Sequence, residues 1–407
     1  MVADTFHDVL WVIGVFEGAD GIQSPYAVGY TGSNWIPFPG TFNANRLTGV
    51  NCAMMYNGNL VLGKTDKVDM FSFTSHQWTT IANTSDEVLC LGVFNGDLIA
   101  GGRFWFLDGN EVNHISKWNG TQWDTLGGGL TGSVYIVECL KVYHNKLYTG
   151  GNFDYAGGVE AWNIAAWNDT TWNNLCSSGG SFGTDELSGN HDAASVMAME
   201  VFNDKLYITG QFEKVCGSNC YLAYWDDTTW HSTSYPYGDG RKLSSSNGKL
   251  VVKSLGIPFP YYYIYYWDGV NAPAVDSAFS GGAAIDLALF QNTLYAGGGF
   301  DFSGNTAAFR IARLVDVGNG IKEIENEYSV AVYPNPVGEQ LTINNGELTI
   351  TEIRITDISG RELLIRNSNI KNQKEVIIDV KELPAGFYII KVNDRNGGVT
   401  VGRFVKQ

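Results

Sequence analysis

Three observations in this sequence predict an all-β protein. Glycine accounts for 49 of the 407 residues, aromatic residues make up 13 %, and charged residues make up only 17 %. This composition is typical of many short strands joined by tight turns. A strand motif recurs along the first three quarters of the chain, and alternating apolar strands follow in the remainder. Together these features argue against a helical bundle and against a disordered chain.

A turn followed by leucine recurs seven times and marks a hairpin. Asn57-Gly58 is an example, and Asn-Gly between apolar runs is a strong hairpin signal. An aromatic residue precedes six of these leucines by four positions, which aligns Phe6 with Phe290. The leucines are Leu10, Leu60, Leu98, Leu147, Leu206, Leu250 and Leu294.

A second hairpin follows the leucine motif and carries two aromatic residues five positions apart. We interpret these aromatics as packing between repeats. Each repeat then contains four short strands, and seven such units predict a seven-bladed β-propeller over residues 1–317. The pairs are Tyr30/Trp35, Phe73/Trp78, Trp118/Trp123, Trp167/Trp172 and Trp225/Trp230.

The glycine pair that ends the second strand, as in Gly150-Gly151, precedes a downstream tryptophan. In this respect the repeat resembles kelch-type repeats, although the turn from Trp167 to Trp172 is tighter than the usual kelch spacing. The resemblance implies an architecture and says little about activity.

The last part of the chain differs in charge and in pattern. Residues 318–327 read as a polar linker, and residues 328–407 are close to neutral, whereas the first 327 residues carry most of the net charge of −16. Alternating runs such as 353–356 and 387–392 predict strands, so we expect a small C-terminal β-sandwich.

Three motifs in this domain resemble the C-terminal sorting domain of type IX secretion substrates. They are Pro334-Asn335-Pro336, the run from Asp357 to Gly360, and Gly386 with Tyr388, and the chain ends close after Lys406. The resemblance implies export across the outer membrane of a Bacteroidota-type bacterium by the type IX machinery. It also implies cleavage by the sortase of that system, followed by release or coupling to surface lipopolysaccharide.

An export signal of the kind that the family requires is not evident near Met1. The first residues contain two acids and no basic stretch, unlike a signal peptide. Aligning Phe6 with Phe290 places Met1 at the start of a strand. We therefore expect the natural protein to extend upstream.

The charge balance excludes some partners. The chain has 42 acidic and 26 basic residues, so phosphate-rich nucleic acid and anionic membranes would be repelled. No run of 18 apolar residues is present, so we expect no transmembrane segment. We expect a monomer.

The long connections after the second strands are where we place a binding site, because such loops on a rigid scaffold often carry binding residues. Aromatic faces next to carboxylates are typical of sugar-binding surfaces. We expect a secreted or surface-bound binding protein for a glycan or a surface partner. The alternative is a carbohydrate-active enzyme that uses carboxylates of the same face. The candidate residues are Trp105, Tyr155, Trp162, Tyr261, Asp108, Asp154 and Glu160.

No catalytic motif and no metal site is predicted, although the acidic insertion around Asp185 leaves calcium open. Cys52, Cys90 and Cys139 occupy one repeat position and read as buried packing residues. Cys216 and Cys220 share a loop, so an exported protein could pair them in a disulfide.

Overall fold

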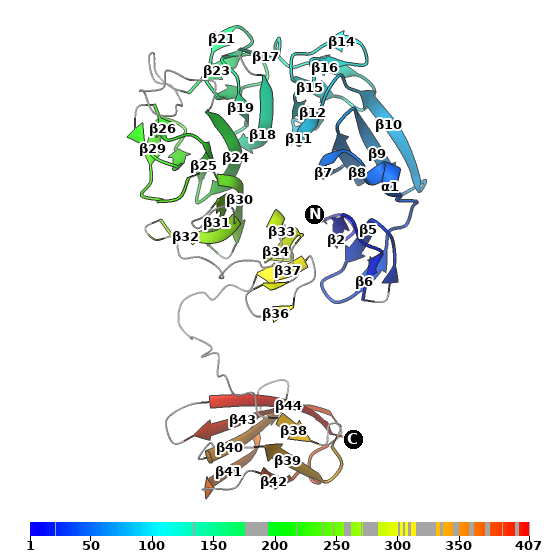
Figure 1. The fold of residues 1–407 in the computed structure, drawn as a ribbon, viewed down its shortest axis with the longest axis vertical. Coiled ribbons are helices and arrows are strands. Elements are labelled where there is room, and N and C mark those ends of the chain that lie inside the picture. The colour runs from blue at the N-terminus through cyan, green and yellow to red at the C-terminus, as the bar shows by residue number, and fades with distance from the viewer. Residues whose placement is uncertain are drawn as a thin grey trace. The chain divides into compact units, whose positions relative to one another are not determined.

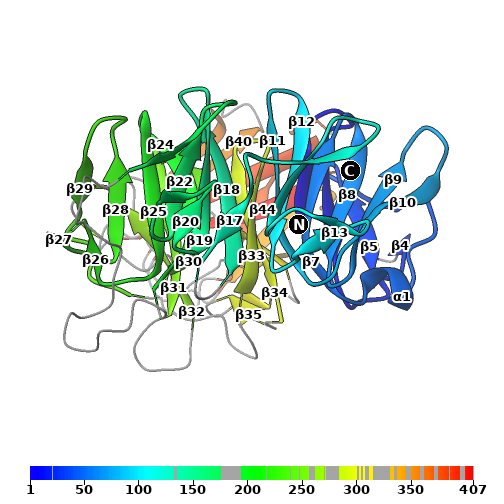
Figure 2. The same ribbon diagram turned by 90° about the horizontal axis from the view of Figure 1, so that it is seen from above.

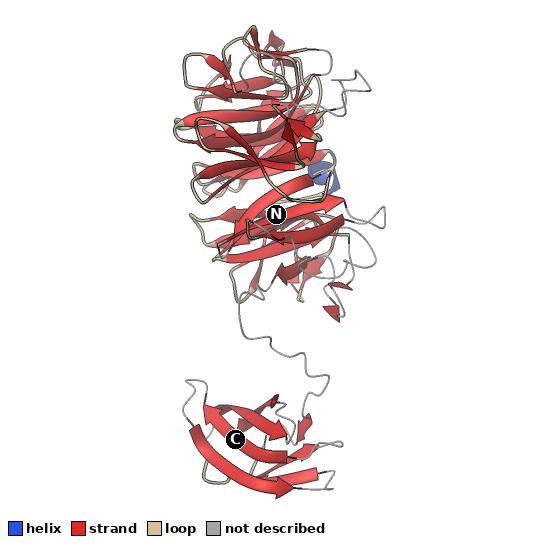
Figure 3. Ribbon diagram, turned by 90° about the vertical axis from the view of Figure 1, so that its left-hand side faces the viewer, coloured by secondary structure: helices blue, strands red, loops and turns tan. Residues whose placement is uncertain are grey.

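The computed structural model describes residues 1–20, 22–132, 135–175, 194–216, 218–238, 240–246, 248–255, 262–269, 271, 284–299, 302–303, 306–307, 311–314, 331–333, 337–344, 350–357, 362–370, 375–384, 386–394 and 399–406. These residues fall into two compact units, Met1–Asp316 and Val317–Gln407. Strands dominate both units, and the helix α1 (Ala44–Leu47) is a short exception within the described part (Figure 1 and Figure 3). The predicted all-β class is confirmed.

The described residues of the N-terminal unit form seven main antiparallel sheets of three or four strands. The first strand of each sheet contacts the first strand of the next, and β33 of the last sheet contacts β1 of the first. Figure 2 shows β11, β18 and β24 alongside one another. The first strands are β1 (Val2–Asp4), β7 (Val50–Tyr56), β11 (Val88–Phe94), β18 (Ile136–Tyr143), β24 (Ser195–Phe202), β30 (Gly240–Ser246) and β33 (Ala284–Phe290).

The other strands of these sheets follow in chain order. The second strands are β2 (Val9–Ile13), β8 (Asn59–Lys64), β12 (Asp97–Gly102), β19 (Lys146–Asn152), β25 (Lys205–Gln211), β31 (Lys249–Leu255) and β34 (Thr293–Gly298). The third strands are β5 (Ala27–Tyr30), β9 (Lys67–Ser72), β15 (Ile115–Trp118), β22 (Ile164–Trp167), β28 (Leu222–Trp225), β32 (Tyr262–Trp267) and β37 (Ile311–Leu314). Five sheets have a described fourth strand: β6 (Trp35–Pro37), β10 (Gln77–Asn83), β16 (Trp123–Thr125), β23 (Trp172–Asn174) and β29 (Trp230–Ser232).

The glycine pair that ends the second strand allows close approach on two sides. A side chain at Gly102 would collide with the backbone oxygen of Glu87, because the preceding strand bulges between Val88 and Cys90. A side chain at Gly101 would come within 2.5 Å of Val137 in the next sheet. The pair therefore marks the place where three strands meet without room for a Cβ atom.

The equivalent cysteines of three sheets join neighbouring first strands. The thiols of Cys52, Cys90 and Cys139 donate to backbone oxygens of the next sheet at 3.7, 3.6 and 3.4 Å. All three are free, and burial raises the pKa of Cys52 to about 12. The predicted role as buried packing residues is confirmed for Cys90, whereas Cys52 and Cys139 are half-buried.

The paired aromatics hold each sheet against its predecessor. The rings of Trp167 and Trp172 lie 5.3 Å apart, and the indole nitrogen of Trp172 donates to the backbone oxygen of Leu126 in the preceding repeat. Trp123 makes the same bond to Ile81 at 2.7 Å. The expected packing between repeats is confirmed at these pairs.

One alignment predicted from the repeat is wrong. Phe6 does not end the first strand but lies in the turn after it, with 79 % of its surface exposed. Asp4 ends β1 instead, is fully buried, and accepts a bond from the indole nitrogen of Trp11 at 3.1 Å. The turn from β1 to β2 is longer than its counterparts, so counting back from Leu10 misplaced the aromatic residue.

The C-terminal unit contains two antiparallel sheets that share one apolar core, which includes Leu341, Ile353 and Phe404. One sheet has the order β38 (Ala331–Tyr333), β39 (Gln340–Asn344), β42 (Glu375–Asp379). The other has the order β41 (Glu362–Ile370), β40 (Ile350–Asp357), β43 (Gly386–Asp394), β44 (Val399–Lys406).

Candidate functional site

Charged side chains from several sheets meet near the first strands of the N-terminal unit. We call Glu87, Arg103, Glu138 and Arg241 the central charge cluster. Arg103 and Glu87 form an ion pair of 3.0 Å between Nε and Oε2. Glu138 in β18 is close enough to Arg241 in β30 for the two charges to interact. Since β18 and β30 belong to sheets that are not neighbours, these side chains face a common central space.

Glu138 is unusual because it forms no hydrogen bond or ion pair with the residues that the structure describes. It occupies the bulge of β18, where the register shifts between Val137 and Cys139. Burial raises the pKa of the Glu138 carboxyl, and the nearby charges of Arg103 and Arg241 oppose that rise. A half-buried carboxyl group with a raised pKa and no partner is a recurrent feature of functional sites.

An aromatic cluster lies beside Arg103. The ring of Trp105 meets His114 at 4.9 Å and Tyr135 at 5.0 Å, edge to face, while His114 and Tyr135 stack at 5.3 Å. Trp105 and Tyr135 are both half-buried. Trp105 and Tyr135 therefore present aromatic surface near Arg103 of the central charge cluster, with His114 buried behind them.

His114 is held in place by the backbone around it. Its amide donates to the oxygen of Phe104 at 3.0 Å, and its Nδ1 lies 3.2 Å from the oxygen of Arg103. The side chain is 2 % exposed, and its Nε2 has no hydrogen-bond partner. Burial lowers the pKa of His114 to about 4, so the imidazole is neutral at neutral pH.

The structure divides the predicted candidate residues between two small hairpins. Trp105 precedes the hairpin of β13 (Phe106–Leu107) and β14 (Asn110–Glu111) and belongs to the aromatic cluster. Asp108 lies in the turn of that hairpin, where its Oδ1 accepts from the Asn83 backbone at 2.8 Å. This bond joins the loop to β10.

The other described candidates surround the hairpin of β20 (Tyr155–Ala156) and β21 (Val159–Glu160). Tyr155 pairs with Glu160 across the hairpin, and the indole nitrogen of Trp162 donates to Glu160 at 3.0 Å. The amide of Asp154 donates to the oxygen of Thr131 in β17 (Leu130–Thr131) at 3.0 Å. Trp105 contacts other rings than Trp162, so the two tryptophans do not form one platform. Tyr261 lies outside the described residues.

Sequence reasoning missed His114, Tyr135 and Glu138. One signal was present, because Glu138 is a charged residue within the apolar run Val137-Glu138-Cys139 at the start of a strand. The nearness of His114 to Tyr135 had no signal, because it depends on how two loops from successive repeats pack.

The predicted pairing of Cys216 with Cys220 is wrong. Cys216 is disulfide-bonded, but Cys220 is a free, buried thiol whose sulfur donates to the oxygen of Ser218 at 3.6 Å. Burial raises the pKa of Cys220 to about 11. The other cysteine of the sequence, Cys176, lies outside the described residues, as does Asp185 in the acidic insertion.

In the part of the chain that the structure describes, no group of three or more His, Cys, Asp or Glu side chains could hold a metal ion. Among the same residues, no helix is long and apolar enough to cross a bilayer.

The sorting motifs lie in the C-terminal unit. Asp357 ends β40 opposite Tyr388 of β43, and Gly386 begins β43. The Tyr388 hydroxyl donates to the oxygen of Pro384 at 2.7 Å, and its ring stacks on Phe404 at 5.4 Å. Lys406 ends β44 and bridges in parallel to Val337. Pro334, Asn335, Pro336 and Gly360 lie outside the described residues.

Comparison with known proteins yields one family and distant structural similarities. Residues 331–407 match the family described as the secretion system C-terminal sorting domain. No curated protein matches the chain.

Two solved structures illustrate the structural similarities. One is PorZ, a surface component of the type IX secretion system of Porphyromonas gingivalis, with 14 % identity, a TM-score of 0.42, and coverage of 98 % of this chain and 58 % of PorZ. The other is the extracellular domain of the one-component system BT4673 from B. thetaiotaomicron, with 11 % identity, a TM-score of 0.45, and coverage of 98 % and 54 %. This chain thus spans little more than half the length of either structure.

The family match covers the unit that contains Asp357, Gly386, Tyr388 and Lys406, where the sequence motifs placed it. Such a sorting tail implies interaction with the type IX secretion machinery. Residues 331–407 are therefore a secretion system C-terminal sorting domain, and the protein is exported to the cell surface or secreted.

Proposed function

We propose that residues 1–317 form a seven-bladed, kelch-like β-propeller that binds a ligand after export by the type IX system. The cyclic contacts from β1 through β33 and back to β1 support this architecture. So does the meeting of Glu138 and Arg241 from sheets that are not neighbours, because the inner strands of a propeller face a common axis. In this proposal the central charge cluster and the aromatic cluster form the binding site.

The observation that carries the proposal is Glu138, a half-buried carboxyl that has no partner among the described residues and lies in β18, just after Tyr135 of the aromatic cluster. A carboxyl group accepts hydrogen bonds from sugar hydroxyls, and Trp105 and Tyr135 offer faces for stacking on a sugar ring. The proposed ligand is therefore a glycan. A surface protein that presents an aromatic or hydroxyl-bearing side chain is the other partner with matching chemistry.

The test uses the full chain with a panel of soluble and insoluble polysaccharides. Retained protein and released reducing ends are measured in the same tubes. We expect retention without release, weakened about tenfold or more by Trp105→Ala, which corresponds to a loss of about 1.4 kcal/mol. Trp162→Ala is the matched control, because Trp162 belongs to the other hairpin and should leave retention unchanged. Failure of every polysaccharide to retain the chain would contradict the glycan proposal.

A second candidate function is hydrolysis of a glycan. The raised pKa of Glu138, to which the nearby charge of Glu87 contributes, favours this alternative, since glycosidases combine a protonated acid with a second carboxylate. Release of reducing ends that falls about 100-fold or more in Glu138→Gln would establish the enzyme. Release that survives this substitution would exclude Glu138 as the acid.

The sorting domain adds a processing step to the proposal. The resemblance described above implies that the sortase removes residues 331–407 and that the propeller is then released or coupled to lipopolysaccharide. Mass spectrometry of the mature protein in culture medium and outer-membrane fractions would distinguish the two fates.

A further inference from the structure

A surface hollow lies between the end of β10 and the hairpin of β13 and β14. Its volume is about 500 Å³, within the range of about 300–1,000 Å³ that is typical of small-molecule sites. None of the residues that line it belongs to the central charge cluster or to the aromatic cluster. The lining residues are Asn83, Thr84, Ser85, Phe106, Asp108 and Gly109.

Hydrogen bonds join the two walls of this hollow. The Asn83 amide donates to Asp108 Oδ1 at 2.8 Å, and the Asp108 amide donates to the oxygen of Asn83 at 2.8 Å. The Ser85 amide donates to the oxygen of Phe106 at 3.0 Å. Ser85 Oγ accepts from the amides of Trp105 and Phe106 at 2.9 and 3.0 Å. The walls are therefore fixed before a ligand arrives, which lowers the entropic cost of binding.

Two polar groups in the hollow keep hydrogen-bonding capacity. Asp108 Oδ1 accepts from both the amide and the side chain of Asn83, whereas Oδ2 forms no bond with the residues that the structure describes. Ser85 Oγ accepts from two amides, and its own proton has no acceptor among the same residues. A carboxylate oxygen accepts from a hydroxyl group, and a serine hydroxyl donates to one. The two groups therefore match a ligand rich in hydroxyl groups.

Phe106 gives the hollow an apolar face. The side chain is 44 % exposed, whereas the next residue of the hairpin, Leu107, is buried. Phe106 also pairs with Glu111 across the hairpin. Leu107 thus anchors the hairpin while the ring of Phe106 remains available for packing against a ligand.

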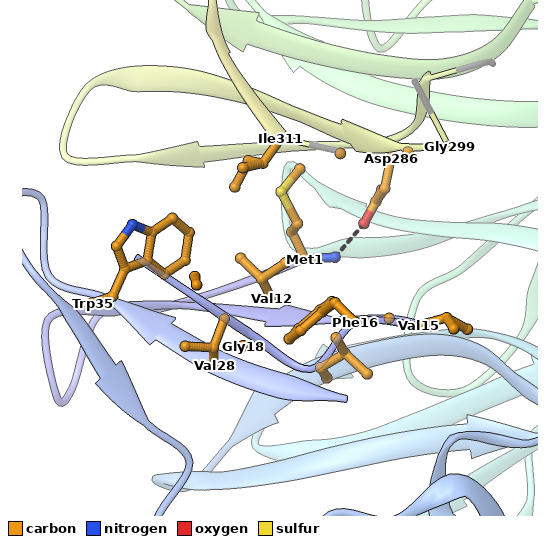
Figure 4. Close-up of a pocket in the computed structure, with 15 residues that line it drawn as sticks. Met1, Val12, Val15, Phe16, Gly18, Val28, Trp35, Asp286, Gly299 and Ile311 are labelled. Atoms are coloured by element: carbon orange, nitrogen blue, oxygen red, sulfur yellow. Dashed lines mark hydrogen bonds and ion pairs between the residues drawn. The ribbon is translucent and has the colours of Figure 1, made fainter. Parts of the chain in front are cut away.

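A different cavity of the N-terminal unit, which Met1 and Trp35 line, has the opposite character (Figure 4). Its volume is about 320 Å³, and its lining is mostly apolar. Its carboxylate, Asp286, is already paired with the Met1 amino group at 2.6 Å and with Lys242 at 2.8 Å. The hollow beside Phe106 is therefore the better match to a polar ligand.

The hollow adjoins the aromatic cluster through two consecutive residues. The amides of Trp105 and Phe106 bond to the same oxygen, Ser85 Oγ. The ring of Trp105 contacts His114 and Tyr135, whereas Phe106 lines the hollow. A chain of sugar units that stacks on Trp105 can thus continue to Phe106.

We propose that the hollow is a second subsite for a neutral oligosaccharide whose other end occupies the site at Trp105. In this subsite Phe106 packs against a sugar ring, Asp108 Oδ2 accepts from a hydroxyl group, and the Ser85 hydroxyl donates to another. The lining residues include one carboxylate and no cation, so a sugar acid is repelled. This inference rests on the proposed function and adds that the ligand is an uncharged oligosaccharide.

The test measures the affinity of the full chain for disaccharides and hexasaccharides of glucose, mannose and xylose by isothermal titration calorimetry. We expect the hexasaccharide of at least one series to bind about tenfold or more tightly than its disaccharide. Phe106→Ala should weaken hexasaccharide binding by about three- to tenfold, because one stacking contact is lost. The affinity for the disaccharide, which occupies the site at Trp105, should stay unchanged. A hexamer of galacturonic acid should bind more weakly than the neutral hexamer, and equal binding would overturn the assignment to neutral sugars.

Two further variants separate binding from folding. Asp108→Asn keeps an oxygen for the Asn83 amide and suits the left-handed φ of 46° at this position. It should therefore weaken hexasaccharide binding without moving the thermal midpoint. Phe6→Ala is the matched control, because Phe6 is an exposed phenylalanine that does not line the hollow.

The outcomes distinguish the two proposals. A hexasaccharide affinity that survives both Phe106→Ala and Asp108→Asn would overturn the second subsite and leave the proposed function standing. Failure of every oligosaccharide to bind would contradict the proposed function itself, and the second subsite with it.

Discussion

Two regions of the N-terminal unit contain histidine and acidic side chains that differ in whether they are paired. Near the centre, His114 and Glu138 have polar atoms without hydrogen-bond partners among the residues that the structure describes. At the turns after the first strands, His144 lies 2.9 Å from Asp204 and 3.6 Å from Asp227.

The turn region is fully connected. Lys146 and the Tyr148 hydroxyl bond to Asp227 at 3.0 and 3.3 Å, and the Tyr143 hydroxyl donates to the oxygen of Asp204 at 2.9 Å. These bonds join β18 and β19 to the turns that follow β24 and β28 in the next sheet. The comparison teaches that the presence of histidine and carboxylate groups is not informative by itself. Their state of pairing separates a region that joins sheets from one that is available to a ligand.

The largest effect that we expect is a loss of folding stability at acidic pH, caused by protonation of His114 in the unfolded chain. Its pKa is lowered to about 4 in the folded protein, whereas the unfolded chain protonates it near pH 6.5. Between these values the unfolded state binds the additional proton, so stability falls as pH decreases from about 6.5 to 4, by about 3 kcal/mol. Urea unfolding across this range should show a smaller fall in His114→Phe. An equal fall in both proteins would contradict the buried neutral imidazole.

A smaller effect is expected from removing one carboxylate in each region. Asp227→Ala should lower the free energy of unfolding by about 1–2 kcal/mol, because Lys146 and Tyr148 lose an acceptor. Glu138→Ala should change it by less than about 0.5 kcal/mol, since no described bond is lost. Urea unfolding at pH 7 measures both. The reverse order would break the comparison.

The smallest effect that we expect is the pH dependence of the stability that His144 contributes in the turn region. The pKa of His144 is raised, mainly by its hydrogen bond with Asp204. The contribution of this exposed pair is therefore present below the pKa of the unfolded chain and disappears as pH rises through the folded value, opposite in sign to His114. The difference in unfolding midpoint between wild type and His144→Asn should shrink as pH rises above neutrality. A difference that grows with pH would contradict the assignment.

The sequence predicts those contacts whose two residues lie in the same repeat better than contacts between residues of different repeats. The pairs Trp118/Trp123 and Trp167/Trp172 were predicted because both partners lie in one hairpin, and the motif around Tyr388 identified the sorting domain. The cluster of Trp105, His114 and Tyr135 was not predicted, because His114 and Tyr135 come from different loops. The bond from the Asn83 amide to Asp108 was not predicted either, because a turn carboxylate that accepts from a neighbouring strand has the same sequence pattern as one that binds a ligand.

The thiols of Cys52, Cys90 and Cys139 have a practical consequence. Each donates to a carbonyl of the following sheet, so each reports on one contact between adjacent sheets. A reagent that modifies thiolates should react with them more slowly while those sheets are in contact, because burial there raises the pKa of the thiols. The rate at which these thiols are alkylated therefore measures whether the chain is folded at each stage of its export.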